Sequence, residues 1–398
     1  MSDRTQRDFL ADGAYSLHEF GAMIASPERV SAYVAALERV VGPDTVVVEV
    51  GAGAGFFSLL ACRMGARRVY AIEANPIIEV ARALAADNGM ADRLVCIDAL
   101  STQVTLPEPA DVLLADLRGV LPFYYGSVES IVDARTRLLK PGGAVIPQRD
   151  TLWAAVVQAP ESYEYINHPW TGAARGLNLT RARTLAVNGW TSARDNDPRL
   201  LSAPAQWSAI DYRIVTDTGA RGTAVTPITA AATAHGVAVW FDAELGGGIG
   251  FSNAPGAPRS VYGRAFFPWV EPQDLAVGDV VETTFHVLPG ASDSVWTWET
   301  RILDAGGTER AAFRQSTFLG GVFSTDRRQR AHTHVPTLSV NGAIERDILS
   351  WIDGRHALGD IASRLHEKYP TVFADWNAAL GRAAEVSGVH ERHDAGTP

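Results

Sequence analysis

"TVVVEVGAGAG", residues 45–55, is a run of β-branched residues that leads into three alternating glycines. The apolar pattern "FFSLLACRMG" follows at residues 56–65, so the glycines are expected to lie between a strand and a helix. Glycine lets a ligand approach the backbone, and a helix N-terminus offers unpaired N–H groups. This stretch therefore predicts the first strand of an α/β sheet and a loop that binds a nucleotide or a nucleotide-like cofactor.

The residues that follow continue the alternation of strand and helix. Strand-like runs end at Glu73, Asp98 and Asp116, and helix-like runs occupy residues 75–89 and 127–139. Such alternation is typical of a parallel, doubly wound sheet of the α/β class. We therefore expect a Rossmann-like domain over residues 43–150, preceded by helices within residues 1–42.

The second half of the chain has a different pattern. Strand-like runs such as "GVAVWFDAEL" and "DVVETTFHVL" predict a β domain over residues 151–328, interrupted by an aromatic, arginine-rich insertion at about 162–199. A charged linker follows. Three short apolar stripes at helical spacing then predict a small helical or winged-helix domain over residues 335–398.

Composition excludes several classes of function. The formal net charge of -10 argues against a nucleic-acid partner, which would require a basic face. No apolar run reaches membrane-spanning length, and the first residues lack the apolar segment of a signal peptide. Cys62 and Cys96 are the only cysteines, and the ten histidines form no ligand set. We expect a cytoplasmic protein without disulfides, metal or a membrane partner.

Two acidic residues define the cofactor more closely. Glu73 ends the second strand, 22 residues after Gly51, where a carboxylate can accept hydrogen bonds from both ribose hydroxyls. Asp98 ends the third strand, beside Ala99, where an acid can accept from an adenine amino group. NAD and S-adenosylmethionine (SAM) both fit these features.

The glycine motif separates the two cofactors. Its glycines, Gly51, Gly53 and Gly55, are spaced differently from the dinucleotide pattern G-x-G-x-x-G. Glu49 opens the motif with an acidic residue, which favours SAM. We therefore predict a SAM site.

Beyond the glycine loop, the sequence resembles the protein arginine methyltransferases over about residues 10–325. "EFGAMIASPERVSAY", residues 19–33, is similar to their cofactor-covering helix, with Arg29 where the family binds the SAM carboxylate. "LLKPGGAVIPQRDTLWAA" at 138–155 and "GFSNAPGAPRSVYGRAFF" at 250–267 resemble segments leading into and through their β-barrel. The resemblance implies a SAM-binding domain, a barrel, a dimerisation arm at about 162–199 and a homodimer.

The acceptor site departs from that family. "ADLRGVLPFYYG", residues 115–126, occupies the loop where the family grips guanidinium with two glutamates; Asp116 and Tyr125 stand at those positions. The family's Thr-His-Trp loop reads Ser260-Val261-Tyr262. A planar guanidinium prefers bidentate carboxylate partners, so peptidyl arginine is not the expected acceptor. One carboxylate among aromatic rings suits an amine instead, with Asp116, Tyr124, Tyr125 and Tyr262 as the acceptor site.

The sequence is compatible with several alternatives. Arg118 could hold a carboxylate substrate, as in an O-methyltransferase, or be a solvated loop residue; His18 is a further candidate substrate contact. Tyr124 and Tyr125 could be core residues. Arginine N-methylation, a catalytically dead scaffold and a SAM-sensing regulator are the other functional hypotheses.

The C-terminal segment carries a second resemblance. "NGAIERDILSWIDGRHALGDIASRLHEKYP", residues 341–370, is similar to winged-helix peptide-recognition domains of ribosomal-peptide pathways, typified by the pyrroloquinoline-quinone peptide chaperone. Such domains bind a leader peptide by strand addition. The resemblance implies a tailoring methyltransferase that acts on a precursor peptide or a related natural product, and daptide-type dimethylation of a C-terminal amine would explain the lost glutamates.

Overall fold

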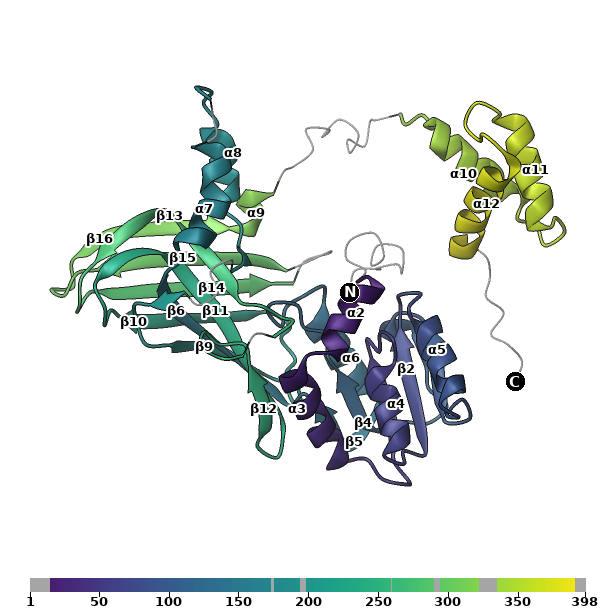
Figure 1. The fold of residues 1–398 in the computed structure, drawn as a ribbon, viewed down its shortest axis with the longest axis horizontal. Helices are drawn as coiled ribbons and strands as arrows, with labels where there is room; N and C mark the ends of the chain where they lie inside the picture. Colours follow the sequence, from purple (N-terminus) through teal and green to yellow (C-terminus); the bar gives the residue numbers. More distant parts are fainter. Residues whose placement is uncertain are drawn as a thin grey trace. The chain divides into compact units, whose positions relative to one another are not determined.

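A computed structural model describes residues 15–172, 175–193, 198–258, 260–289, 294–321 and 335–390. The chain divides into two compact units, Met1–Val322 and Phe323–Pro398 (Figure 1). The first unit holds a parallel sheet and an antiparallel β domain, and the second is a small bundle of helices.

The glycine motif follows the central strand of the parallel sheet. Its strand order is β3-β2-β1-β4-β5, and every pairing is parallel, which confirms the predicted Rossmann-like sheet. The strands are β1 (Val46–Val50), β2 (Arg68–Glu73), β3 (Leu94–Asp98), β4 (Ala110–Ala115) and β5 (Leu139–Ile146). All five residues of β1 are buried, which explains its unbroken β-branched run. The strand order reverses beside β1, where sheets of this kind bind ligands beyond the carboxyl ends of their strands.

Helices connect these strands and precede them. α4 (Phe56–Arg63), α5 (Ile78–Asp87) and α6 (Ser127–Arg137) connect strands of the sheet. Before β1, α2 (Leu17–Ile24) starts at a capping box formed by Ser16 and Glu19, and α3 (Pro27–Glu38) starts at a proline. α3 contacts both α4 and the β domain strand β12 (Ile249–Ser252), so it joins the two parts of the first unit (Figure 1).

The β domain consists of two antiparallel sheets. One has the order β10-β14-β15-β16, and the other contains β7-β13-β11-β6-β8 with β12 on β11 and β9 on β6. Aromatic rings fill the interior; Phe267, for example, lies edge-on to Trp298 with ring centroids 5.1 Å apart. The remaining bounds are β6 (Arg149–Gln158), β7 (Thr191–Ser192), β8 (Arg199–Leu200), β9 (Ala205–Asp211), β10 (Ala220–Pro227), β11 (Ala232–Gly246), β13 (Ala265–Leu275), β14 (Val280–Leu288), β15 (Val295–Leu303) and β16 (Glu309–Ser316).

The arginine-rich insertion forms helices at one end of this domain. α7 (Pro160–Asn167), a 3-10 turn (His168–Trp170) and α8 (Thr180–Ala186) follow β6, and α9 (Thr317–Gly320) contacts α8 (Figure 1). Tyr165, Trp170 and Leu177 are exposed on this segment. Large apolar side chains gathered on one projection are a common feature of protein interfaces.

The second unit contains α10 (Val340–Trp351), α11 (Leu358–Lys368) and α12 (Trp376–His390) around its own core, which includes Ile348 and Leu365. The helical expectation is therefore confirmed. Residues 335–390 contain no strand, so the wing expected of a winged-helix domain is absent from this described part. None of the helices in the described part of the chain is long and apolar enough to span a membrane.

Candidate functional site

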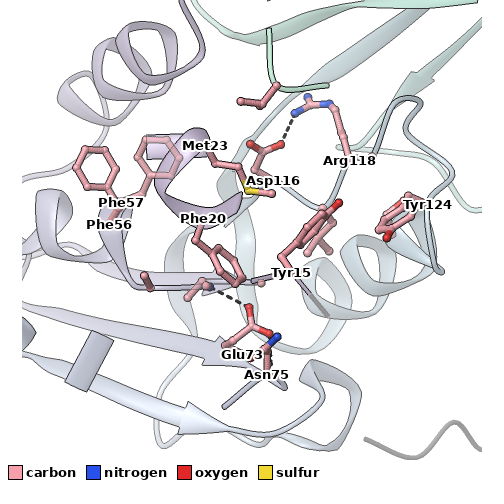
Figure 2. A pocket seen from close by; sticks show the side chains of 18 of the residues that line it. Tyr15, Phe20, Met23, Phe56, Phe57, Glu73, Asn75, Asp116, Arg118 and Tyr124 are labelled. Carbon is pink, nitrogen blue, oxygen red and sulfur yellow. Dashed lines mark hydrogen bonds and ion pairs between the residues drawn. The ribbon is translucent and has the colours of Figure 1, made fainter. Parts of the chain in front are cut away.

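A cavity of about 350 Å³ lies beyond the carboxyl ends of β1, β2 and β4 (Figure 2). Side chains from α2, α3, the glycine loop, the loop after β4 and the loop around Tyr262 line it. Its lining brings together most of the residues predicted from the sequence: Arg29, Glu49, Gly51, Gly53, Glu73, Asp116, Arg118, Tyr124, Tyr125 and Tyr262. Its size falls within the usual range for small-molecule and cofactor sites.

The glycine loop requires glycine for conformation and for space. Gly51, Gly53 and Gly55 have φ values of +73°, +55° and +77°, which side-chain-bearing residues rarely adopt. A Cβ at Gly53 would lie 2.6 Å from the ring of Phe20, and one at Gly51 would lie 2.2 Å from Leu117. α2 and the loop after β4 therefore pack directly against the glycine backbone.

Glu73 lies at the floor of the cavity and organises the loop (Figure 2). Its Oε2 accepts a hydrogen bond from the backbone N–H of Gly53 at 2.9 Å, and Oε1 accepts from the N–H of Asn75 at 2.8 Å. Burial raises the Glu73 pKa, although these backbone hydrogen bonds act to lower it. A third backbone hydrogen bond, from Ala74, acts in the same direction. An ionised carboxylate has about four acceptor positions, so Glu73 can still accept from a ligand.

Asp98 lies next to Glu73, which it pairs with in register across β2 and β3. The backbone N–H of Ala99 donates to the carbonyl oxygen of Glu73 at 3.2 Å. Asp98 is exposed, and neither Asp98 nor Ala99 belongs to the described lining of the cavity. Both thus border the predicted cofactor side without closing it.

Glu49 is buried at the carboxyl end of β1 and accepts a short hydrogen bond from the hydroxyl of Ser58 on α4. Burial raises its pKa to about 8, against the opposing effects of Ser58 and Arg29. The carboxyl group is therefore mostly protonated at neutral pH in the protein without a ligand. A cation entering the cavity would favour its ionised form.

Arg29 connects the covering helices to the loop after β4. Its Nε donates to Oδ2 of Asp116 at 2.6 Å, and its Nη1 donates to the carbonyl oxygen of Met23 at 3.0 Å. The guanidinium lies 4.9 Å from the centroid of the Phe57 ring. Arg29 thus faces the cavity while its position is fixed by contacts to Asp116, Met23 and Phe57.

Asp116 is buried and paired on both of its oxygens. Oδ2 accepts from Arg29 and from the Tyr262 hydroxyl, which is 2.6 Å away, and Oδ1 accepts from Nη1 of Arg118 at 3.0 Å. Burial alone would raise the Asp116 pKa, but Arg29 and Arg118 outweigh it and lower the pKa below its ordinary value. Asp116 is therefore ionised, and its charge is balanced within the protein.

Arg118 contradicts the expectation of a solvated loop arginine. Its side chain is only 3% exposed and forms a bidentate pair with Asp150 at the start of β6, with distances of 2.7 Å and 2.8 Å. Nη1 also donates to the Tyr33 hydroxyl at 2.7 Å. Arg118 is thus held away from solvent by Asp150, a carboxylate of the β domain. Asp150 is 32 residues away in the sequence, so no local pattern indicated this contact.

Aromatic rings form the remaining wall. Tyr124 and Tyr125 are half-buried, lie edge-to-face at 4.5 Å and line the cavity, so they are not core residues. Tyr15 lies 6.3 Å from Tyr124 and 5.9 Å from Phe20, measured between ring centroids. Tyr262 is buried and stacks on Phe251 at 5.6 Å.

The structure adds residues that the sequence did not single out. Tyr15, Phe20, Met23 and Asn75 line the cavity, and Asp150 supports it from the β domain. The covering-helix segment contains two of these residues, but no local pattern marks Asp150. His18, in contrast, is exposed on α2 and lies outside the described lining of the cavity.

Comparisons with known proteins agree with this architecture. The family model described as "Ribosomal protein L11 methyltransferase (PrmA)" matches residues 31–147. Two solved structures share the fold: Arabidopsis thaliana protein arginine methyltransferase 10 (TM-score 0.68, 19% identity, 76% of this chain and 97% of that one) and the Trypanosoma brucei PRMT1 enzyme-prozyme complex with AdoHcy (TM-score 0.67, 17% identity, 76% and 98%).

Two curated relatives are more similar in sequence to this chain than the two solved structures are. An "Arginine N(omega)-methyltransferase" from Streptomyces achromogenes subsp. streptozoticus is 32% identical over 268 residues, which cover 65% of this chain and 73% of the relative. A "Probable histone-arginine methyltransferase 1.4" from Arabidopsis thaliana is 31% identical over 268 residues, covering 63% of this chain and half of the plant protein. The chain therefore belongs to the protein arginine methyltransferase family of SAM-dependent enzymes.

Proposed function

We propose that this methyltransferase transfers the methyl group of SAM to an amine nitrogen of a peptide or a related natural product. The observation that carries the amine proposal is the composition of the cavity wall. Among the described residues that line the cavity, the acids are Glu49, Glu73 and Asp116, and only Asp116 lies on the loop after β4. Tyr125 occupies the position nine residues later where the resemblance places a second glutamate.

The residues of the cavity fit SAM. The glycine loop lets a cofactor approach the backbone closely, because its glycines carry no side chains. Glu73 would hold the ribose hydroxyls, and Arg29 would hold the carboxylate of the methionine part. When bound, SAM supplies an electrophilic methyl group on a sulfonium centre. The protein's contribution is then to orient the acceptor nitrogen and to balance the charge that develops on it.

Asp116 and the aromatic wall would perform this task. A carboxylate next to the acceptor orients an N–H group and stabilises an ammonium product, and the faces of Tyr124 or Tyr125 attract a methylated cation. Carboxylate O-methylation loses its support, because Arg118, the group that would hold a carboxylate substrate, is already paired with Asp150, Asp116 and Tyr33. Membership of an enzyme family likewise removes the support for a SAM-sensing regulator.

Arginine N-methylation is the second candidate, and the comparisons favour it over an amine. The Streptomyces relative is named as an arginine N(omega)-methyltransferase, and it aligns with this chain over most of its length. The amine proposal rests instead on the departures at Asp116 and Tyr125. A direct acceptor assay is therefore required to decide between the two nitrogens.

A pair of matched peptides provides that assay. One peptide carries an arginine and has its N-terminus blocked, whereas the other has no arginine and a free compact amine at its C-terminal end. Both are incubated with the enzyme and isotopically labelled SAM, and the products are mapped by mass spectrometry. We expect label on the amine peptide; label on the arginine side chain alone would establish the second candidate and reject the first.

The precursor-peptide part of the proposal rests on the resemblance of residues 341–370 alone. Strand addition requires a sheet edge, and the described residues 335–390 contain no strand. A leader peptide would therefore have to bind to the helices. Deleting residues 335–398 is expected to raise KM for a full-length precursor without changing SAM affinity, and an unchanged KM would remove this role.

A further inference from the structure

Arg118 and Asp150 form a buried ion pair that reaches from the β domain to the acceptor carboxylate. Arg118 donates to both oxygens of Asp150 through Nε and Nη2, and to Oδ1 of Asp116 through Nη1. The side chain of Asp150 is fully buried, and its Oδ2 also accepts from the Tyr212 hydroxyl at 2.7 Å. The guanidinium is thus fixed between two carboxylates, one from each domain of the first unit.

Arg29, Arg118, Asp116 and Asp150 form a cluster of charged side chains whose net charge is zero. Arg29 and Arg118 contribute two positive charges, and Asp116 and Asp150 contribute two negative charges, all on buried side chains. Other titratable groups among the described residues that act on Asp116 include the phenols of Tyr15, Tyr33 and Tyr262 and the carboxyl group of Glu49. Burial raises the pKa of each of these phenols and of Glu49, so none of them carries a full charge near neutral pH.

We propose that Arg118 and Asp150 are positioning residues that hold Asp116 in an electrically neutral cluster, so that the site accepts a nitrogen that arrives uncharged and rejects a guanidinium. The proposal rests on the function proposed above and adds the basis of acceptor selection. In this arrangement Asp116 orients an N–H group of the acceptor and can stabilise the ammonium that forms on it, whereas the cluster as a whole has no excess negative charge to offset an incoming guanidinium.

The selection follows from acid–base chemistry. A guanidinium stays protonated in proteins at any ordinary pH, so it would bring an unbalanced charge into a buried site. An amine has a pKa of about 8 at an α-amino group and about 10 on an alkyl chain, so it loses its proton at a much smaller cost than a guanidinium does. The neutral amine also carries the lone pair that attacks a methyl group.

An adjoining cavity supports the same conclusion. It has a volume of about 420 Å³ and shares Val120, Val261 and Tyr262 with the first cavity. The described residues that line it include no aspartate or glutamate. Among these described residues, an acceptor that extends into this space meets no carboxylate able to compensate a cationic group.

Binding of cofactor–acceptor conjugates tests the proposal independently of turnover. Three SAM-derived conjugates are used, in which the methyl group is replaced by a short chain ending in an amine, a guanidinium or a methyl group. Calorimetry on the wild-type chain should show the amine conjugate binding about tenfold or more tightly than the guanidinium conjugate. The affinity of the amine conjugate relative to that of the methyl-ended conjugate should rise with pH above about 7, and this ratio separates deprotonation of the amine from ionisation of Glu49 near pH 8. Equal or tighter binding of the guanidinium conjugate would overturn the proposal.

Charge-changing variants then test the ion pair itself. Arg118→Met leaves the cluster with a net negative charge, and it should raise guanidinium-conjugate affinity about tenfold and remove the rise with pH. Asp150→Asn creates a net positive charge and should do the opposite. The double variant Arg118→Met with Asp150→Asn restores neutrality and should restore the wild-type preference, a recovery that a purely structural role does not produce.

The outcomes separate this proposal from the proposed function. If none of the conjugates binds, there is no SAM site and the proposed function fails with it. If all three bind equally well, the cluster makes no contact with the acceptor, and the selection proposal fails while the cofactor site stands. Thermal unfolding identifies folded variants, and the Asp150→Asn variant, which keeps the shape of the side chain, decides the role of the pair if Arg118→Met does not fold.

Discussion

Nε of Arg29 lies 2.6 Å from Oδ2 of Asp116, so the residue expected to hold the cofactor carboxylate directly contacts the residue expected to hold the acceptor. The two come from α3 and from the loop after β4, 87 positions apart in the chain. Their contact places the cofactor and acceptor sides of the cavity at one boundary. The ion pair therefore helps to hold both side chains in place at that boundary.

Glu73 is expected to determine cofactor affinity. Glu73→Gln keeps the size of the side chain but removes the charge-assisted hydrogen bonds to a ribose, so SAM binding should weaken by about 1–3 kcal/mol. Calorimetry measures this change, with Glu79→Gln on the exposed face of α5 as the control. Unchanged SAM affinity, together with binding of NAD, would contradict the cofactor assignment.

Phe20 is expected to cover the bound cofactor, because its ring packs against Gly53. Phe20→Ala removes apolar surface from the cavity wall and should weaken SAM binding by roughly 1–2 kcal/mol. Leu17→Ala, on the same helix but exposed, should leave affinity unchanged. Tighter SAM binding by the Phe20 variant would show that the ring competes with the cofactor instead of covering it.

Glu49 is expected to make stability depend on pH. Its pKa is about 8 in the folded chain and about 4.3 when unfolded, so the folded state holds a proton that the unfolded state has released between these values. The stabilisation is complete below about pH 4 and is lost as pH rises through about 8. Denaturant unfolding of the cofactor-free protein should show a larger loss of stability between pH about 6 and 9 in the wild type than in Glu49→Gln. Equal losses would contradict the raised pKa.

The helical insertion after β6 is expected to bury its apolar side chains against a second copy of the chain, giving a two-fold dimer. Leu177→Asp should shift the sedimentation equilibrium toward monomer. Ile214→Asp, which is equally exposed but lies elsewhere in the β domain, should not. A wild-type chain that sediments as a monomer at micromolar concentration would reject this arm as an interface.

Local sequence patterns predicted the parallel sheet and the cofactor side well, for physical reasons. Neighbouring parallel strands end at the same edge, so Glu49, Glu73 and the glycines had to meet once the strands were recognised. Asp150 could not be predicted in this way, because it meets Arg118 across a domain boundary, 32 residues away. The wing was expected from apolar spacing that any small helical bundle shares, and nothing in that spacing requires a strand.

Asp116→Asn is the decisive variant for the acceptor site. The substitution keeps the shape of the side chain and removes the charge that faces the acceptor, so kcat for methyl transfer to the amine peptide should fall by roughly 10²-fold or more. Asp111→Asn, at the other end of β4 and half-exposed, is the matched control and should retain activity. We predict that steady-state kinetics will show the large fall in kcat for Asp116→Asn, with SAM affinity within a few-fold of wild type; full activity of this variant would contradict the account.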